Sequence, residues 1–308
     1  MAWTMESEVI FILADTQAVR LIRSKGFQTK VLDSSWNDLE TELPKFLDYI
    51  EQEQVKVLLV DFYYVTEKYL ASLQRVTHVV YIDDLNNIRY PVDILISYVN
   101  YWKKMNYEKN YPTTQLLLGC AYVPLRKEFQ NLPPKNIRKN IENLLILTGG
   151  SDNYDISEHV LEHLDLNKYK KVDVICGRYY EKFDYLQDKY KPCTNVKLHQ
   201  AVDNIIDYMI DADVVISAGG TTLYELCATG TPTITYSCAD NQLDNVRQFA
   251  EDGIMQYAGD IRTDDVYDIM IQILEKYNDK ISRRRLSLQE TGLIDGNGAG
   301  RIIGNLYI

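Results

Sequence analysis

The sequence has few histidines, no excess of basic residues and no long apolar run. It contains four histidines, and its 33 lysines and arginines are outnumbered by 44 aspartates and glutamates, which gives a formal net charge of −11 at pH 7. A nucleic-acid partner is not expected, because no basic stripe is available to neutralise phosphates. No apolar run approaches the length of a membrane span, so we predict no transmembrane helix.

Cysteine is also sparse and is not arranged in pairs. The five cysteines are an odd number, are widely spaced and include no Cys-x-x-Cys pair. This pattern argues against a disulfide framework and against a zinc site, and it is typical of a reducing compartment. The start of the chain carries acids where a signal peptide needs bases. We therefore expect a cytoplasmic protein with no metal and no other cofactor.

What the sequence does contain is a regular alternation of strand and helix signals, the pattern of parallel-sheet α/β domains. One helical face is marked by apolar residues between positions 39 and 50, and another between 266 and 277. The predicted strands are residues 9–14, 28–32, 55–60, 78–82, 94–97 and 116–120 in the first half, and 144–147, 172–175, 196–199, 214–217, 233–236 and 255–258 in the second.

The best candidate for a linker is the segment 131–140. It contains Pro133 and Pro134, basic residues and asparagines, and almost no apolar periodicity. A chain of 308 residues is long enough for two α/β domains. We therefore predict two Rossmann-like domains, residues 1–135 and 136–308, with a ligand cleft between them.

The most informative segment spans residues 213–236. An apolar strand leads into the turn Ala218-Gly219-Gly220, and Thr221-Thr222 opens a helix that carries Glu225 in its first turns. Unpaired N–H groups and the positive end of the helix dipole at such a position favour an anion, most often a phosphate. Glu225 is close enough to accept hydrogen bonds from an attached ribose. The segment predicts a nucleotide-diphosphate site, and the alternative is a structural βα turn, of which every α/β protein has several.

Other polar residues also follow predicted strands. Asn241-Gln242 comes after the strand 233–236, and α/β folds place ligand contacts at the carboxyl ends of strands. The turn Gly149-Gly150-Ser151-Asp152 repeats the strand-to-glycine pattern. Its N–H groups and the Ser151 hydroxyl could meet a diphosphate or a sugar, while Asp152 could equally cap the next helix. Asp61 and Tyr63, at the end of another buried strand, are also well placed for polar chemistry.

The remaining glycines and histidines have structural interpretations. The run from Gly296 to Gly300 follows no strand and lacks the spacing of a dinucleotide fingerprint, so it predicts a turn that starts a last helix. His159 and His163 have metal-ligand spacing on a predicted helix, but no third ligand is evident nearby, and a solvated helix face is the stronger interpretation. His199 could border the cleft, although a structural role is favoured.

These segments together resemble a known family. The pattern of residues 213–242 resembles the C-terminal domain of the PseG-like UDP-sugar hydrolases, also called SpsG-like spore-coat polysaccharide proteins, which are relatives of the MurG glycosyltransferases. Similar elements occur elsewhere in the chain, namely Asp61-Phe62-Tyr63, Asp83-Asp84, Gly119 to Tyr122 with Leu125-Arg126, Gly149 to Asp152, the turn at 202–204 and the segment 293–301.

The resemblance implies a GT-B fold with UDP bound by the C-terminal domain. It implies hydrolysis of UDP-2,4-diacetamido-2,4,6-trideoxy-β-L-altropyranose to UDP and the free sugar, a step toward pseudaminic acid. Carried over by motif, Glu225 would bind the ribose, and Asn204 and Ile205 would lie near the uracil. Tyr63, Asn241 and Gln242 would approach the sugar, with Tyr63 and Asn241 as candidate catalytic residues. The diphosphate would face Ser217, Ala218, Gly219, Gly220, Thr221 and Thr222, with Gly149, Gly150 and Ser151 as further substrate contacts.

One element of the family pattern has no counterpart in this sequence. The family opens with a strand, a Gly-x-Gly-His loop and a helix, and the loop histidine is its candidate base; this sequence begins at what resembles the family's second strand, about thirty residues later. General acid–base catalysis is worth about two to four orders of magnitude in rate, so we expect UDP-sugar binding with weak or absent hydrolysis. The alternatives are a MurG-like transferase and a non-catalytic nucleotide-sugar-binding protein. We expect a monomer or a weak homo-oligomer.

Overall fold

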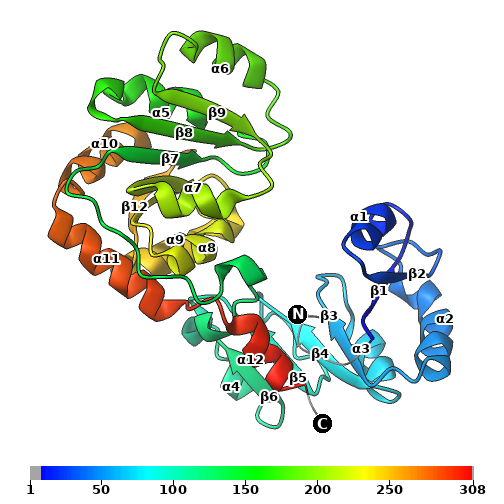
Figure 1. Cartoon of the computed structure of the whole chain (residues 1–308). Coiled ribbons are helices and arrows are strands. Elements are labelled where there is room, and N and C mark those ends of the chain that lie inside the picture. The colour runs from blue at the N-terminus through cyan, green and yellow to red at the C-terminus, as the bar shows by residue number, and fades with distance from the viewer. Residues whose placement is uncertain (1–7, 307–308) are drawn as a thin grey trace. The chain divides into compact units, whose positions relative to one another are not determined.

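The computed structural model describes residues 8–306 (Figure 1). The chain divides into two compact units, which are described separately: unit 1 is Met1–Pro124 with Ala299–Ile308, and unit 2 is Leu125–Gly298. Residues 1–7, on which the argument against a signal peptide depends, lie outside the described part of the chain. Within residues 8–306 no helix combines the length and the apolar character needed to cross a membrane.

The division between the units differs from the boundary expected at 135/136. The predicted linker belongs to unit 2, because its polar side chains are bonded to that unit: Lys135 Nζ donates to the carbonyl oxygens of Met209 and Ile210, at 2.8 Å each. The last helix, α12 (Gly298–Gly304), places Ile302 in a core cluster of unit 1 with Ile94. The end of the chain therefore belongs to unit 1, and the second domain does not extend to residue 308.

Unit 2 is built on one six-stranded parallel sheet, with the strand order β12-β11-β10-β7-β8-β9. The chain adds strands outward from β7 on one side and then from β10 on the other, so the order reverses between these two neighbouring strands. The strands are β7 (Asn143–Leu147), β8 (Lys171–Cys176), β9 (Val196–Gln200), β10 (Val214–Ala218), β11 (Thr233–Ser237) and β12 (Gln256–Asp260). Each predicted strand of this half is confirmed, with shifts of one or two residues at its ends.

Helices cover both faces of this sheet. Successive residues of a strand point to opposite faces, and every residue of β10 and β11 is buried, so neither face of these strands is open to solvent. The helices of unit 2 are α5 (Ile156–His163), α6 (Phe183–Tyr190), α7 (Ile205–Asp211), α8 (Thr222–Thr229), α9 (Leu243–Glu251), α10 (Val266–Lys276) and α11 (Lys280–Leu293).

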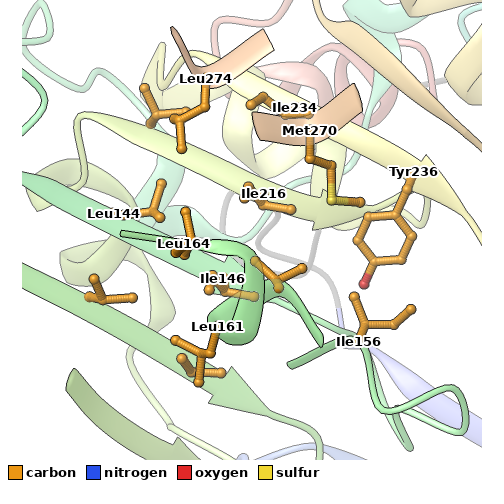
Figure 2. Packing of buried hydrophobic residues seen from close by; sticks show 14 of the residues in the cluster. Leu144, Ile146, Ile156, Leu161, Leu164, Ile216, Ile234, Tyr236, Met270 and Leu274 are labelled. Carbon is orange, nitrogen blue, oxygen red and sulfur yellow. The ribbon is translucent and has the colours of Figure 1, made fainter. Parts of the chain in front are cut away.

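The core on one face of the sheet follows from the strand periodicity. Figure 2 shows alternate residues of three adjacent strands pointing into one cluster, where they meet side chains of α5 and α10. Met270 and Leu274 of α10 are almost fully buried, in agreement with the predicted apolar stripe, whereas Ile269 of that stripe is 39% exposed. Full burial of one such side chain contributes about 1.5–3 kcal/mol. The strand residues are Leu144, Ile146, Ile216, Ile234 and Tyr236.

The strands of unit 1 are also parallel, and they fall into two sheets. One sheet pairs β1 (Ile10–Leu13) with β2 (Gln28–Val31), and the other has the order β3-β4-β5-β6. Each predicted strand of this half has a counterpart, although the strand expected at 116–120 ends earlier and continues into a 3-10 helix, η3 (Cys120–Tyr122). The four-stranded sheet comprises β3 (Val57–Val60), β4 (His78–Ile82), β5 (Ile94–Ser97) and β6 (Gln115–Leu118); the helices are α1 (Val19–Ser24), α2 (Leu39–Gln52), α3 (Glu67–Gln74) and α4 (Tyr107–Asn110).

Helix α2 shows how local sequence sets an element of this unit. The Asp38 side chain accepts a hydrogen bond from the Thr41 N–H at 3.2 Å and so caps the helix start. Leu43, Phe46 and Ile50 then recur at helical spacing and are buried in the core of the unit, as their periodicity predicts.

Candidate functional site

The predicted site residues of unit 2 gather at one edge of its sheet. Because all six strands are parallel, the loops that follow them lie at the same edge. The turn Gly149-Gly150 follows β7 and the turn Gly219-Gly220 follows β10, and these two strands are hydrogen-bonded neighbours. They are also the strands between which the order reverses, the place where open α/β sheets bind ligands. The sequence indicated both glycine turns but not that they are adjacent.

Gly219 is required by packing. A Cβ at this position would lie 2.3 Å from Val246 Cγ1 of α9 and 3.3 Å from the Tyr236 carbonyl oxygen. The Asn245 side-chain amide donates a hydrogen bond to the Gly219 carbonyl at 3.3 Å. Gly220 differs, because a Cβ there would meet nothing within 4 Å. The turn is therefore fixed against α9 on one side and open on the other.

The open side of this turn presents main-chain donors. After the turn, the first N–H groups that donate a hydrogen bond are those of Leu223 and Tyr224. They donate to the carbonyls of Gly220 and Thr221 at 3.1 and 3.0 Å. Among the described residues, the N–H groups of Gly220, Thr221 and Thr222 have no protein acceptor. These three donors stand at the positive end of α8, a helix of eight residues, and can hold an anion.

Ser217 and Ala218 are the last two residues of β10, and both are buried. The Ser217 side chain is 1% exposed, and its hydroxyl donates to the Ala218 carbonyl at 3.1 Å. Ala218 is 8% exposed. The hydroxyl of Ser217 is therefore not presented to a ligand. Of the expected diphosphate contacts, Gly219, Gly220, Thr221 and Thr222 remain.

Glu225 lies one turn into α8 and is ion-paired. Its Oε1 accepts a hydrogen bond from Arg126 Nη2 at 3.1 Å, and Arg126 Nη1 contacts Glu128 Oε1 at 3.0 Å. Burial raises the pKa of the Glu225 carboxyl, while Arg126 acts in the opposite direction. Sequence reasoning did not connect Arg126 with Glu225; the only signal was the Leu125-Arg126 element of the family resemblance.

The second glycine turn is shaped by a third glycine that the sequence analysis overlooked. A Cβ at Gly177, directly after β8, would lie 2.0 Å from the Gly150 carbonyl oxygen. The Tyr179 N–H donates to the same carbonyl at 3.2 Å. Gly149 has φ +81, the left-handed region that favours glycine. The turn is thus held from the β8 side, while Gly149 and Gly150 are exposed. The signal for Gly177 was its place immediately after a predicted strand.

Asp152 has the capping role that was left open. Its carboxylate accepts hydrogen bonds from the Ile156 and Ser157 N–H groups at the start of α5, at 2.8 and 3.0 Å. The side chain is buried, and burial raises its pKa. Ser151, next to it, is partly exposed and remains available at the edge of the sheet.

The remaining predicted contacts of unit 2 also lie at this edge. Asn241 is exposed in the 3-10 helix η6 (Asp240–Gln242) after β11. Gln242 closes its own loop by accepting a hydrogen bond from the Cys238 N–H at 2.9 Å. Asn204 precedes α7 after β9 and donates to Asp207, and Ile205 begins that helix, partly buried. The structure brings these loops to the same edge as the two glycine turns.

Tyr63 belongs to unit 1. The residue is 62% exposed, and its hydroxyl donates a hydrogen bond to Asp84 Oδ2 at 2.8 Å. Burial, aided by the charge of Asp84, raises the pKa of Asp61. Asp83, the other member of the acidic pair, accepts hydrogen bonds from the Leu85 and Asn86 N–H groups, so its carboxylate holds the loop after β4. Tyr63 follows β3 and Asp84 follows β4, so both residues lie just beyond the carboxyl ends of neighbouring strands in the four-stranded sheet.

The histidines of unit 2 have structural partners. His199 Nε2 lies 2.9 Å from Asp173 Oδ1, and its ring meets Tyr208 edge-on, in agreement with the favoured interpretation. His159 and His163 both pack on the Tyr267 ring. No group of three or more histidine, cysteine or acidic side chains among residues 8–306 is arranged to hold a metal ion, and the five cysteines are free thiols.

Part of unit 2 is similar to a known glycosyltransferase domain. Residues 144–291 match the model of the glycosyltransferase family 28 C-terminal domain. Over 243 residues, 74% of this chain, it is 25% identical to the uncharacterized protein MJ1062 of Methanocaldococcus jannaschii, covering 48% of that protein. Over 199 residues, 61% of this chain, it is 27% identical to the spore coat polysaccharide biosynthesis protein SpsG of Bacillus subtilis, covering 57% of it. The chain thus spans about half the length of the curated relatives it matches.

The fold is shared more widely than the sequence. The crystal structure of MurG from Acinetobacter baumannii aligns over 97% of this chain and 90% of its own, with a TM-score of 0.68 and 12% identity. The expected GT-B-like α/β fold, with parallel sheets and flanking helices, is confirmed.

Proposed function

We propose that unit 2 binds the UDP part of a UDP-sugar. The observation that carries this proposal is the set of three N–H groups at residues 220–222, which have no acceptor among residues 8–306 and lie one helical turn from the Glu225 carboxylate. The amides would hold the diphosphate and Glu225 the ribose hydroxyls, while the Gly149-Gly150-Ser151 turn adds donors from the neighbouring strand. The match to the family 28 domain over residues 144–291 supports the same assignment.

The reaction we propose is hydrolysis at the anomeric carbon of the sugar. Water would attack that carbon, and the bond to the diphosphate oxygen would break, releasing UDP and a free 2,4-diacetamido-2,4,6-trideoxyhexose. Main-chain donors at the start of α8 would stabilise the negative charge that develops on the departing diphosphate. The similarity to SpsG supports a place in the biosynthesis of a surface or spore-coat polysaccharide, and the family resemblance supports a route to pseudaminic acid.

Within this proposal the other predicted contacts of unit 2 have roles as well. Asn204 and Ile205 would lie beside the uracil, and Asn241 and Gln242 would face the sugar. Asn241 is the residue of unit 2 that we propose touches the reacting centre.

A transferase is the second candidate. It is favoured by the match to a glycosyltransferase domain and by the MurG-like fold. A transferase uses the same donor site but passes the sugar to an acceptor, so the two reactions differ in whether free sugar appears without one.

The test combines two measurements on the same preparation. Isothermal titration with UDP reports the site, and release of free sugar from UDP-2,4-diacetamido-2,4,6-trideoxy-β-L-altropyranose, without acceptor, reports hydrolysis. We expect UDP to bind, and release of free sugar without an acceptor, even at a low rate, supports hydrolysis. Binding with turnover only after an acceptor is added would favour the transferase, binding without any turnover would indicate a nucleotide-sugar-binding protein, and absence of UDP binding would contradict the site itself.

A further inference from the structure

A short segment of unit 2 lies beside the proposed ribose carboxylate. This Arg126 segment, residues 126–130, contains the 3-10 helix η4 (Lys127–Phe129) and contacts α8. The Phe129 side chain is fully buried, and the Phe129 N–H donates to the Arg126 carbonyl at 3.0 Å. The segment is therefore anchored in unit 2 immediately after Arg126.

A glycine holds the other side of this segment. A Cβ at Gly296 would lie 2.0 Å from the Phe129 carbonyl oxygen, and Gly296 has φ +77. The two backbones approach this closely only because residue 296 has no side chain. Gly296 thus permits the close backbone contact with Phe129, three residues after Arg126.

The Arg126 guanidinium is held by three groups. Nη2 donates to Glu225 Oε1 at 3.1 Å, Nη1 lies 3.0 Å from Glu128 Oε1, and Cζ is 5.3 Å from the centre of the Phe129 ring. Within the described residues, Oε1 of Glu225 accepts a hydrogen bond and Oε2 accepts none. The ion pair therefore orients the carboxylate and leaves one oxygen for a ligand.

We propose that Arg126 is a positioning residue for nucleotide binding, which keeps the Glu225 carboxylate oriented so that Oε2 can accept the ribose hydroxyls. This inference rests on the proposed UDP site. Arg126 acts through Glu225, whereas the main-chain amides at the start of α8 act on the diphosphate.

The charges around Glu225 give the inference a measurable sign. Burial raises the pKa of Glu225, Arg126 lowers it and Glu128 raises it. These two are the charged groups acting on Glu225 in the part of the chain that the structure describes; α7 and α11, which also pack on α8, contribute none. Without Arg126 the carboxyl is protonated at a higher pH, and a neutral carboxylic acid is a weaker acceptor. Binding that depends on the ribose is then lost earlier as the pH falls.

The experiment compares two nucleotides and four proteins between pH 5 and 8. UDP carries the ribose hydroxyls and 2′,3′-dideoxy-UDP lacks them. The dissociation constant of 2′,3′-dideoxy-UDP divided by that of UDP therefore isolates the ribose contact from the titration of the diphosphate. In Arg126→Met we expect this ratio to fall about tenfold relative to wild type near pH 5.5, the size of a lost charge-assisted hydrogen bond, and clearly less at pH 8. Arg126→Lys should restore most of it.

Glu128→Gln is the matched control, because it removes the second carboxylate that contacts Arg126 and leaves Arg126 in place. In this variant the ratio should fall at a lower pH than in wild type, whereas in Arg126→Met it should fall at a higher pH. Thermal melting of all variants checks that they are folded.

The possible failures are distinct. Wild type that binds neither nucleotide overturns the proposed function and this inference with it. Wild type that prefers UDP, with an unchanged ratio in Arg126→Met at every pH, overturns this inference alone. Equal weakening of both nucleotides in Arg126→Met shows that Arg126 acts on the phosphates or on the fold, and also overturns it.

Discussion

Gly219 and Gly220 are adjacent in the sequence but are needed for different reasons. Gly219 makes room for α9, since a Cβ there would lie 2.3 Å from Val246 Cγ1, whereas Gly220 faces open space. The sequence pattern shows two equivalent glycines. Only the packing distinguishes the residue that stabilises the turn from the one that leaves the approach to the amides free.

This difference predicts unequal effects on stability for two alanine substitutions. Gly219→Ala should lower the free energy of unfolding by about 1–3 kcal/mol, because the new methyl group overpacks the contact with α9. Gly220→Ala should change stability by less than about 0.5 kcal/mol, as for an unhindered surface site. Urea denaturation of both variants measures the difference, and equal stability of the two would contradict the assigned packing.

Elements were predictable wherever one local signal determined them. The strands of unit 2 are short apolar runs because helices cover both faces of the sheet, and α2 and α10 have clear apolar stripes. The contact between Gly177 and the Gly150 carbonyl, and the ion pair between Arg126 and Glu225, join segments far apart in the chain. Such contacts depend on strand order and helix packing, which the periodicity of one segment does not specify.

The start of α5 offers a prediction for the second glycine turn. Asp152→Ala removes the acceptor for the Ile156 and Ser157 N–H groups and should cost about 0.5–2 kcal/mol of stability. It should also weaken UDP binding, because Asp152 directly follows Gly149-Gly150-Ser151.

Asp279→Ala is the matched control for that variant. Asp279 caps α11 by accepting from the Ile281 and Ser282 N–H groups, and it adjoins no residue of the proposed site. A similar loss of stability with unchanged UDP affinity is expected from calorimetry and titration. If both variants bind UDP as wild type does, the Gly149–Ser151 turn has no part in the site.

For the molecule as a whole, the predicted domain boundary was displaced because burial overrode composition. The segment 131–140 reads as a linker, with two prolines and little apolar periodicity, yet Lys135 is bonded to α7 carbonyls and Arg138 pairs with Asp211. Phe129, just before it, is fully buried. Unit 2 is therefore a self-contained unit only if it begins near residue 125.

Two fragments test this boundary. Residues 125–298 should fold and retain UDP affinity, whereas residues 136–298 lack the buried Phe129 ring, Arg126 and the Lys135 contacts. Loss of a buried phenylalanine alone costs about 3–5 kcal/mol, so the shorter fragment should melt at a clearly lower temperature. Circular dichroism and titration compare them, and equal stability would show that the predicted linker contributes nothing to unit 2.

The most direct test of the account follows the backbone amides during a UDP titration of ¹⁵N-labelled protein by NMR. We predict that UDP shifts the signals of Gly220, Thr221 and Thr222 together, with the same midpoint as the binding heat, since these are the N–H groups without a protein acceptor among the described residues. If UDP binds while those three signals stay in place, the diphosphate is held elsewhere and the proposed site is wrong.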